Sequence, residues 1–268
     1  MNLDPVAAHL AAEWGFAPTE ELPGGHCSRV YADEKRVLKV PFQGEEMESG
    51  FIHMTYLTQC APVIYRSDSA TGALLMERII PGTALHEADL SEDAQIEIWR
   101  KLADYIRSRS YGRFMTDEYG GDHHTNIDLM PLAKYTNQED DLARYLLEAK
   151  IEPVHLHGDL HHFNILLNGD QWVFIDSKGL YGDPAFEGAA YVRNPIPGIG
   201  QFSVSQIKER VFAVAKALDV EPFRVWGWSV AQLRDGLPDP GTPWHDALEK
   251  LYACSAEFGA ERFVRPLA

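Results

Sequence analysis

The side chains best suited to chemistry lie in one segment, HLHGDLHHFNILLNGDQWVFIDSKG, which spans residues 155–179. Asn164 offers a carbonyl oxygen and Asp176 a carboxylate, and such hard oxygen ligands suit magnesium, which also binds waters and substrate phosphates. Asp159 lies five residues before Asn164 and could accept a proton from a substrate hydroxyl. The segment therefore predicts a general base beside a magnesium site.

A predicted β-hairpin would bring these side chains together. Residues 165–167 and 172–175 have the apolar pattern of two strands, and the Asn-Gly pair at 168–169 suits a tight turn because both residues accept positive φ. The open ends of this hairpin would carry Asn164 and Asp176 side by side.

The spacing is that of a kinase catalytic loop, H-x-D-x-x-x-x-N followed by a metal-binding Asp. His157, Asp159 and Asn164 fit it without adjustment. A single Asp before a hairpin is more often a turn or cap residue, so the interpretation depends on the ordered set.

A buried-looking lysine upstream extends the pattern. Lys39 lies in the apolar run 37–40, where an ammonium is costly unless it is paired. Such a lysine suits a position between nucleotide phosphates and a helix carboxylate. Glu48 is our first choice for that carboxylate, with Glu45 and Glu46 as alternatives, because one sequence does not fix the rotation of the helix.

A small glycine-containing loop, GGHCS, occupies residues 24–28 between two candidate strands. Its backbone N–H groups could cover phosphates, and Gly25 and Ser28 are the residues that we expect to contribute. A glycine pair alone more often marks an ordinary turn.

The hydrophobic pattern changes near residue 80 and predicts an α+β chain with two parts. Residues 1–80 are expected to form a small antiparallel sheet plus one helix, and residues 81–268 a larger, mainly helical part that holds the catalytic hairpin. The expected strands lie at 29–31, 36–40 and 73–77, and the expected helices at 45–59, after Ser91, from Asn137, after Ser203, at 222–235 and at 243–258.

Longer motifs resemble a known family. HGDLHHFNILL, VFIDSKGLYGDPAFEGA, GGHCSRVY, VLKV and LLMERIIPG resemble the aminoglycoside phosphotransferases, which have the protein-kinase-like fold. His161-His162 and the Asp-x-Lys-Gly at 176–179 favour the aminoglycoside/hydroxyurea resistance kinase branch, which includes streptomycin 6-phosphotransferases, although Ser177 stands where that branch usually has proline. The resemblance spans residues 24–188. It implies two lobes, ATP or GTP as co-substrate, Mg2+ as cofactor, and phosphate transfer to a small-molecule hydroxyl.

The resemblance also implies a role for each matching residue. It assigns the catalytic base to Asp159, support of the catalytic loop to His157, magnesium binding to Asn164 and Asp176, the inner phosphates to Lys39 with Glu48, and the nucleotide base to the hinge backbone at Glu77 and Ile79. Glu187 is expected to brace the catalytic loop, and His161 and His162 either line the cleft or lie on a surface loop.

Composition and charge narrow the partners. The 268 residues carry 24 basic and 40 acidic side chains, a net charge of −16 that disfavours binding to a nucleic-acid backbone. No apolar run approaches the roughly 20 residues of a membrane helix, so we expect a cytoplasmic protein. Residues 88–175 hold 8 basic and 16 acidic side chains, and this balance favours a cationic acceptor such as an aminoglycoside. The residues do not distinguish ATP from GTP or fix an oligomeric state.

Three alternatives stay open from the sequence. The first is a kinase for a neutral or zwitterionic sugar or amino alcohol. The second is a binuclear metallohydrolase, because His155, His157, Asp159, His161 and His162 superficially match a His/Asp zinc cluster. The third is a nucleotide-binding module without catalysis.

Overall fold

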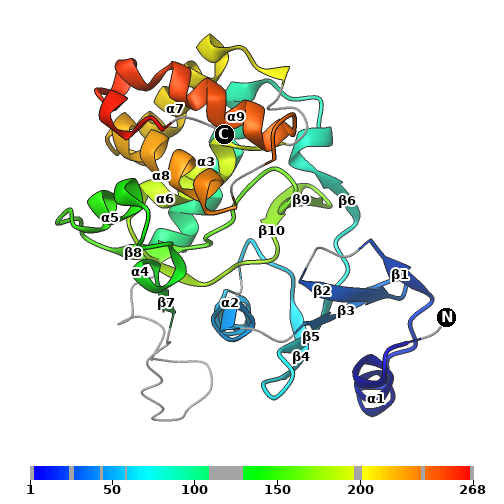
Figure 1. Cartoon of the computed structure of the whole chain (residues 1–268). Coiled ribbons are helices and arrows are strands. Elements are labelled where there is room, and N and C mark those ends of the chain that lie inside the picture. The colour runs from blue at the N-terminus through cyan, green and yellow to red at the C-terminus, as the bar shows by residue number, and fades with distance from the viewer. Residues whose placement is uncertain are drawn as a thin grey trace.

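An antiparallel sheet of five strands forms the N-terminal lobe of the computed structural model (Figure 1), which describes residues 3–23, 27–42, 45–57, 59–108, 129–195, 201–236 and 239–265. The strand order is β1-β2-β3-β5-β4. Their bounds are Glu20–Leu22, Ser28–Ala32, Arg36–Pro41, Ala73–Glu77 and Ile64–Asp68, respectively. β1 and β4 were not among the strands predicted from the sequence.

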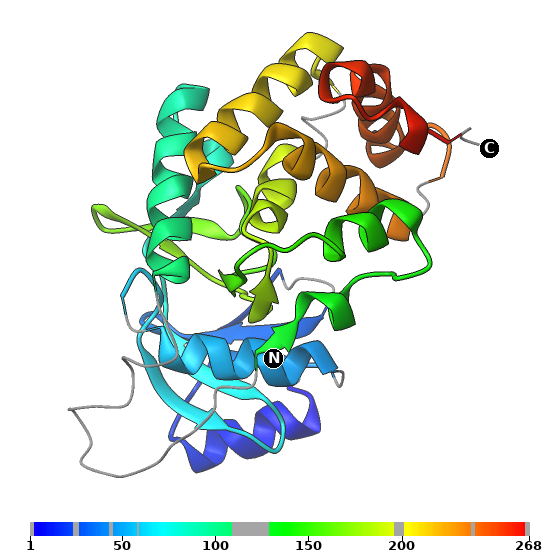
Figure 2. The same cartoon turned by 90° about the vertical axis from the view of Figure 1, so that its left-hand side faces the viewer.

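Two helices cover opposite faces of this sheet (Figure 2). Helix α2, Glu45–Tyr56, confirms the helix predicted at 45–59. It packs Met54 against the sheet face that carries Leu74 and Met76. Helix α1, Pro5–Glu13, packs on the other face, which carries Tyr31. The expectation of a single helix in this lobe was therefore wrong.

Helix α1 has a clear start signal. The Asp4 carboxylate accepts hydrogen bonds from the backbone N–H groups of Val6 and Ala7, and Pro5 fills the first helical position. The Tyr31 hydroxyl donates to Asp4 over 2.9 Å and ties the helix start to the sheet.

The chain leaves the sheet at the end of β5 and enters the C-terminal lobe at β6, Pro81–Ala84. The predicted boundary at residue 80 falls between these two strands. β6 pairs with β9, Ile165–Asn168, which in turn pairs with β10, Gln171–Phe174. The predicted hairpin is therefore confirmed and lies where the two lobes meet (Figure 1).

The turn of this hairpin lies one residue later than expected. Asn168 pairs with Gln171, which leaves Gly169 and Asp170 as the turn residues. Gly169 takes the positive φ of 61°. Asn168 instead contacts the hinge: its side-chain amide donates to Glu77 over 3.1 Å and accepts from the N–H of Ile80 over 3.4 Å.

Helices dominate the rest of the C-terminal lobe, as predicted. Ser91 caps α3, and Ser203 with Gln206 forms the predicted capping box of α7. Trp226 and Trp228 of α8 are fully buried and belong to the hydrophobic core. The main helices are α3 Glu92–Arg107, α5 Asp141–Leu147, α6 Ala185–Val192, α7 Val204–Leu218, α8 Pro222–Asp235 and α9 Pro243–Ala253.

Smaller elements complete this lobe. The strands β7 Met130–Pro131, β11 Leu180–Gly182 and β8 Val154–Leu156 form a third sheet in that order. The remaining elements are α4 Leu132–Tyr135 and 3-10 turns at Leu85–Glu87, Ser255–Phe258 and Glu261–Phe263.

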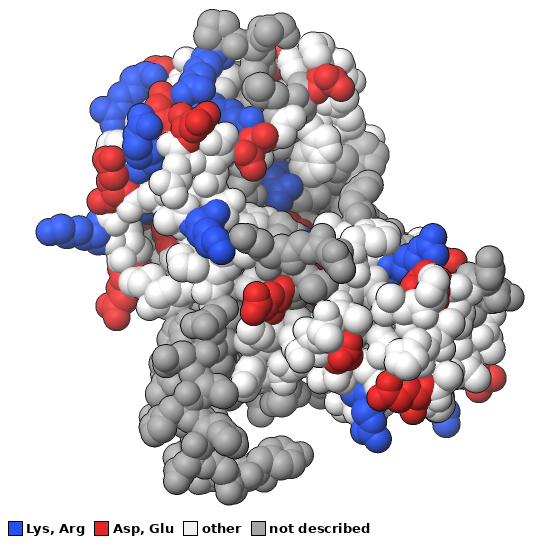
Figure 3. Space-filling model, turned by 60° about the horizontal axis from the view of Figure 1, so that its bottom comes forward, with Lys and Arg blue, Asp and Glu red and all other residues white. Residues whose placement is uncertain are grey.

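Acidic and basic side chains are interspersed on the face of the molecule drawn in Figure 3. Among the described residues, no helix combines the length and the apolar character that crossing a membrane would take.

Candidate active site

The hairpin brings the predicted catalytic residues together. Ile165 pairs with Phe174, and the N–H of Ile175 donates to the carbonyl of Asn164 over 2.9 Å, so Asn164 and Asp176 lie at neighbouring strand ends. The side-chain amide of Asn164 donates to the carbonyl of Asp159 over 2.9 Å. The predicted base and the two predicted metal ligands therefore share one site.

The donor set at the hairpin end fits a magnesium ion. The Asn164 amide spends its nitrogen on Asp159, which leaves its oxygen for a cation. Asp176 supplies a carboxylate from a left-handed backbone conformation, φ 64°, which Asp tolerates better than bulkier residues. An amide oxygen and a carboxylate match the hard-oxygen preference of magnesium.

Both oxygens of the Asp159 carboxylate face a nitrogen. Arg193 Nη2 lies 3.2 Å from Oδ1, and His161 Nε2 lies 3.6 Å from Oδ2. Burial works to raise the pKa of Asp159, but His161, Arg193 and Lys178 outweigh it and hold that pKa well below its ordinary value. The carboxylate is thus ionised at neutral pH.

His157 orients the loop and has no free ring nitrogen. Its Nε2 lies 2.9 Å from the carbonyl of Ile175, and its Nδ1 accepts the N–H of Asp159 over 3.2 Å. Complete burial lowers the pKa of His157 to about 4, so the ring is neutral. This geometry suits the predicted supporting role.

Glu187 of α6 holds the backbone of the catalytic loop, as predicted from the sequence. Its carboxylate accepts the backbone N–H groups of His157 over 2.6 Å, Gly158 over 3.2 Å and Leu160 over 3.4 Å. Burial raises the pKa of Glu187 to about 7 against these hydrogen bonds. Gly158 has φ 84°, and a Cβ there would lie 2.7 Å from the Leu180 side chain, so the turn requires glycine.

Lys39 reaches across from the sheet and pairs with Asp176. Burial works to raise the pKa of Asp176, but the Lys39 ammonium, followed by Lys178 and His157, holds it below its ordinary value. The expected pair of Lys39 with Glu48 is not among the ion pairs of the described residues, and Glu48 is exposed.

The contacts of α2 explain this difference. Ser49 and His53, one turn apart, face the loop after Asp176: the Ser49 hydroxyl donates to the carbonyl of Lys178 over 2.6 Å, and His53 Nδ1 lies 2.5 Å from the Ser177 hydroxyl. Glu48, one residue before Ser49, therefore points away from the loop. The side chains of the alternatives at 45 and 46 lie outside the described residues.

The remaining nucleotide-binding predictions fall on the N-terminal lobe and hinge. Ser28 is buried at the start of β2, on the same sheet face as Lys39, because Val30 pairs with Lys39. Gly25 lies outside the described residues. Glu77 donates its N–H to the carbonyl of Val63 over 2.8 Å, which takes that group out of use, whereas no hydrogen bond among the described residues uses the N–H of Ile79.

A pocket of about 360 Å³ adjoins the base. Gly158 and Arg193, both neighbours of Asp159, line it. The other described lining residues are Met130, Lys134, Tyr135, Gln232 and Asp235. The pocket is the best candidate for the acceptor site because it opens beside the group that would receive the proton.

Sequence reasoning missed Arg193. It donates from Nε to Gln232 over 2.8 Å, lies over the ring of Trp244, and reaches Asp159 across 34 residues of sequence. No local signal marks it, since these contacts depend on how α6, α8 and α9 pack. Ser49 and His53 could have been found from their one-turn spacing on the predicted helix.

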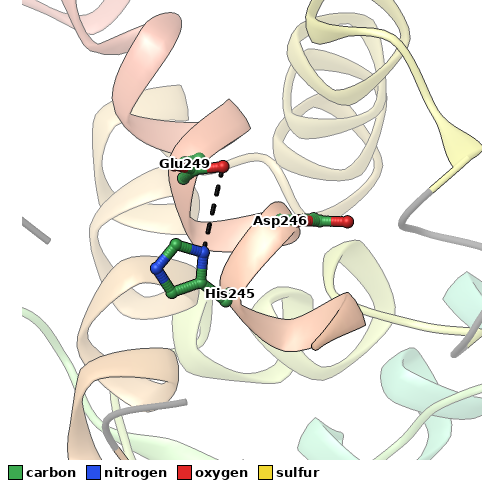
Figure 4. A group of neighbouring side chains, drawn as sticks. All are labelled: His245, Asp246 and Glu249. Atoms are coloured by element: carbon green, nitrogen blue, oxygen red, sulfur yellow. Dashed lines mark ion pairs between the residues drawn. The ribbon is translucent and has the colours of Figure 1, made fainter. Parts of the chain in front are cut away.

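The histidines of the segment do not form a zinc cluster. His157 uses both ring nitrogens within the protein, and His162 is buried against Arg210. Among the described residues, the potential metal-binding group is His245, Asp246 and Glu249 on α9, far along the chain. Figure 4 shows His245 facing Glu249 while Asp246 points away from both, as expected for an i, i+4 pair.

Comparison with protein families identifies the segment around the catalytic hairpin. Residues 126–235 match the family described as aminoglycoside/hydroxyurea antibiotic resistance kinase. This segment of the chain is similar to that family. The match confirms the resemblance drawn from the motifs, and the matched kinase segment runs from the residues before β7 to the end of α8.

A curated protein similar to part of this chain is the streptomycin 3''-kinase of Klebsiella pneumoniae. It is 35% identical over 102 residues, which cover 34% of this chain and 36% of that protein. The similarity in sequence thus extends over about a third of each protein.

Solved structures confirm the fold over nearly the whole chain. APH(2'')-IIa, solved in a ternary complex with streptomycin and ATP, has a TM-score of 0.60 at 17% identity, with 99% of this chain and 100% of that chain covered. The choline kinase LicA of Streptococcus pneumoniae has a TM-score of 0.59 at 12% identity, with 94% and 98% covered. The two-lobed, protein-kinase-like α+β fold is therefore confirmed.

Proposed function

We propose that the protein transfers the terminal phosphate of a nucleoside triphosphate, ATP or GTP, to a hydroxyl of a small molecule. The observation that carries this proposal is the convergence of Asp159, Asn164 and Asp176 at one hairpin end, with Lys39 opposite them. The family match of the kinase segment supports it.

The reaction needs few covalent roles from the protein. The acceptor oxygen forms a bond to the terminal phosphorus, the bond to the bridging oxygen breaks, and its electron pair leaves with the nucleoside diphosphate. The hydroxyl proton passes to Asp159. Positioning and electrostatic stabilisation supply most of the rate enhancement.

The ionisation state of Asp159 suits this task. His161 and Arg193 hold its pKa low against the effect of burial, so it is a weak base that mainly orients the hydroxyl. A loose phosphoryl-transfer transition state asks for little proton removal before the bond to phosphorus forms. Mg2+ held by Asn164 and Asp176 would neutralise phosphate charge.

For the nucleotide, we propose that Lys39 contacts the inner phosphates, that the loop with Gly25 and Ser28 covers them, and that the hinge backbone holds the base. The free N–H of Ile79 supports the hinge role. Lys39 pairs with Asp176 in the structure. On this proposal Lys39 would turn to the phosphates, and Asp176 would then be free to hold the metal.

For the acceptor, we propose a cationic, aminoglycoside-like molecule. The family of the kinase segment and the streptomycin 3''-kinase similarity support this choice. The acidic balance of residues 88–175 supports it only weakly, because Glu97 and Asp104 of α3 already pair with Arg100.

A second candidate acceptor is a zwitterionic or neutral hydroxyl compound. The pocket beside Asp159 favours it, since its described lining holds two cations, Lys134 and Arg193, and one acid, Asp235. An anionic or hydroxyl group near the cations and an amine near Asp235 would match these charges.

A panel assay tests the function and separates the two acceptors. The protein, Mg2+ and either ATP or GTP are incubated with aminoglycosides, amino alcohols or sugars, and mass spectrometry reports which compound gains a phosphoryl group. Asp159→Asn is the negative control. Transfer to any of these hydroxyl compounds supports the proposal, whereas absence of nucleotide binding, or stoichiometric zinc in the purified protein, contradicts it.

A salt series then tests the charge of the acceptor. If carboxylates in the cleft recruit a cation, kcat/KM for that acceptor should fall as ionic strength rises, because the Debye length shortens from about 10 Å at 0.1 M to about 3 Å at 1 M. A flat profile with an amino alcohol or sugar would favour the second candidate.

A further inference from the structure

The two histidines of the His161-His162 pair have different surroundings. His162 is fully buried, and its Nε2 lies 2.8 Å from Arg210 Nη2, deep in the C-terminal lobe. His161 faces the active site, with 15% of its side chain exposed. The doublet therefore splits into a core residue and a site residue.

We propose that His161 is a further catalytic residue that donates a hydrogen bond to the phosphoryl group in transfer. The proposal rests on the phosphotransferase function proposed above. Three features of the loop carry it: the tautomer of the ring, the long contact of its N–H with Asp159, and its position between Asp159 and Asn164.

The tautomer follows from a backbone contact. The N–H of Phe163 donates to His161 Nδ1 over 3.2 Å, so Nδ1 is an acceptor and carries no proton. In the neutral ring the proton is then on Nε2, and the loop itself presents this N–H to the site.

The acceptor that faces this N–H is Asp159 Oδ2. It lies 3.6 Å away, a long contact that a ligand oxygen at hydrogen-bond distance could replace. The other neighbour, Asn164 Nδ2 at 3.5 Å, cannot accept from this N–H, because an amide nitrogen only donates, and one of its two hydrogens goes to the carbonyl of Asp159. A donor in this position is ready for an oxygen of a ligand.

The position of His161 between Asp159 and Asn164 points to the phosphoryl group as the ligand of its N–H. Arg193 holds Oδ1 of Asp159 and lines the acceptor pocket, so the acceptor approaches that oxygen. His161 lies by the other oxygen, next to Asn164, where a metal-bound phosphate would lie. The phosphoryl group must pass between these two sides, and its non-bridging oxygens need donors as charge develops there.

The proposed hydrogen bond from His161 adds no bond-making or bond-breaking step to the reaction. His161 keeps its proton throughout, while the acceptor proton goes to Asp159 and the electron pair of the broken bond leaves with the nucleoside diphosphate. Removing one such donor typically lowers a rate by about 100- to 1,000-fold in an oxyanion site. For the longer contact here, we expect about 10- to 100-fold.

A binding experiment tests the contact without needing the natural acceptor. Calorimetry measures the affinity of ADP with Mg2+, first alone and then with fluoroaluminate, which occupies the place of the phosphoryl group. In the wild type, fluoroaluminate should tighten ADP binding. In His161→Ala, ADP alone should bind within about 2-fold of the wild type, and the gain from fluoroaluminate should shrink by about 10-fold.

Two further variants make the result specific. His161→Gln keeps an N–H donor at similar reach and should recover most of the gain. His245→Gln makes the same change at a histidine with a similar exposure, 12%, and should leave the gain unchanged.

The outcomes separate this proposal from the function on which it rests. An equal fluoroaluminate gain in wild type and His161→Ala contradicts the role of His161 alone, as does a wild type that binds ADP but gains nothing. A wild type that binds no ADP contradicts the phosphotransferase itself. Circular dichroism confirms folding, and an unfolded His161→Ala moves the decision to His161→Gln and His161→Leu.

Discussion

The two sides of the active site are held in different ways. In the catalytic loop, Glu187 accepts three backbone N–H groups, His157 fixes the N–H of Asp159, and Asn164 donates to the same residue. On the N-terminal side, the ion pair that the described residues give Lys39 is with Asp176, which belongs to the other lobe.

This difference in how the two sides are held leads us to expect that catalysis and nucleotide binding respond to different substitutions. The groups proposed to handle the acceptor hydroxyl are fixed by hydrogen bonds within one lobe, so we expect their geometry not to depend on a ligand. The groups proposed to hold phosphates come from both lobes, so we expect their geometry to depend on how the lobes lie. Substitutions on the two sides should therefore affect different measurements.

The largest effect should come from Asp159→Asn. The amide cannot accept the acceptor proton, so kcat should fall by about 100- to 10,000-fold. Turnover of a panel acceptor measures this, with the exposed turn residue Asp170→Asn as a matched control. Loss of less than 10-fold would mean that Asp159 is not the base.

Glu187→Gln should destabilise the loop and change the pH dependence of stability. The new amide places an N–H donor against backbone donors, which costs about 1 to 3 kcal/mol. The folded pKa of Glu187, about 7, is above its ordinary value, so its protonated form stabilises the wild type at low pH, and that contribution is lost as pH rises through about 7.

Denaturant titrations at pH 5, 6, 7 and 8 check this prediction. Between pH 5 and pH 8 the wild type should lose on the order of 3 kcal/mol relative to Glu187→Gln. Parallel pH profiles for the two proteins would show that Glu187 does not titrate in this range.

Lys39→Met should weaken nucleotide binding more than catalysis. Removing the ammonium takes one charge-assisted contact of about 1.5 to 3 kcal/mol from the phosphates, a loss of roughly 10- to 100-fold in affinity. Calorimetry with ATP and Mg2+ measures this loss of affinity. Lys35→Met, at an exposed lysine between β2 and β3 of the N-terminal lobe, is the control. Unchanged affinity would remove Lys39 from the nucleotide site.

The smallest effect should come from Glu48→Gln. Because Glu48 is exposed and Lys39 pairs with Asp176, nucleotide affinity and kcat should both stay within about 2-fold. A 10-fold loss in either quantity would restore Glu48 as the partner of Lys39 in the nucleotide-bound state.

The features that the sequence predicted best are those set by residues close to one another in the chain. The hairpin followed from its two apolar runs and turn residues, and α3 and α7 followed from their caps, because these signals act over a few residues. The loop geometry around Asp159 followed from spacing for the same reason. Helix α1 could also have been found, since Asp4 and Pro5 form an ordinary helix start.

What the sequence did not predict depends on packing between distant elements. The partner of Lys39 lies 137 residues away, and the partner of Arg193 lies 34 residues away. Neither contact has a local pattern, because the rotation of α2 and the packing of α6 against α8 decide them. The pocket proposed for the acceptor is likewise lined by described residues from four separate segments.

The central claim, that base and metal ligand divide the work, is tested most directly by one titration. ATP is titrated into Asp159→Asn and Asp176→Asn by calorimetry, with and without Mg2+. The account predicts that Asp159→Asn binds ATP within about 3-fold of the wild type and keeps its dependence on Mg2+, whereas Asp176→Asn loses most of that dependence. Equal ATP affinities and equal Mg2+ dependence in the two variants would contradict it.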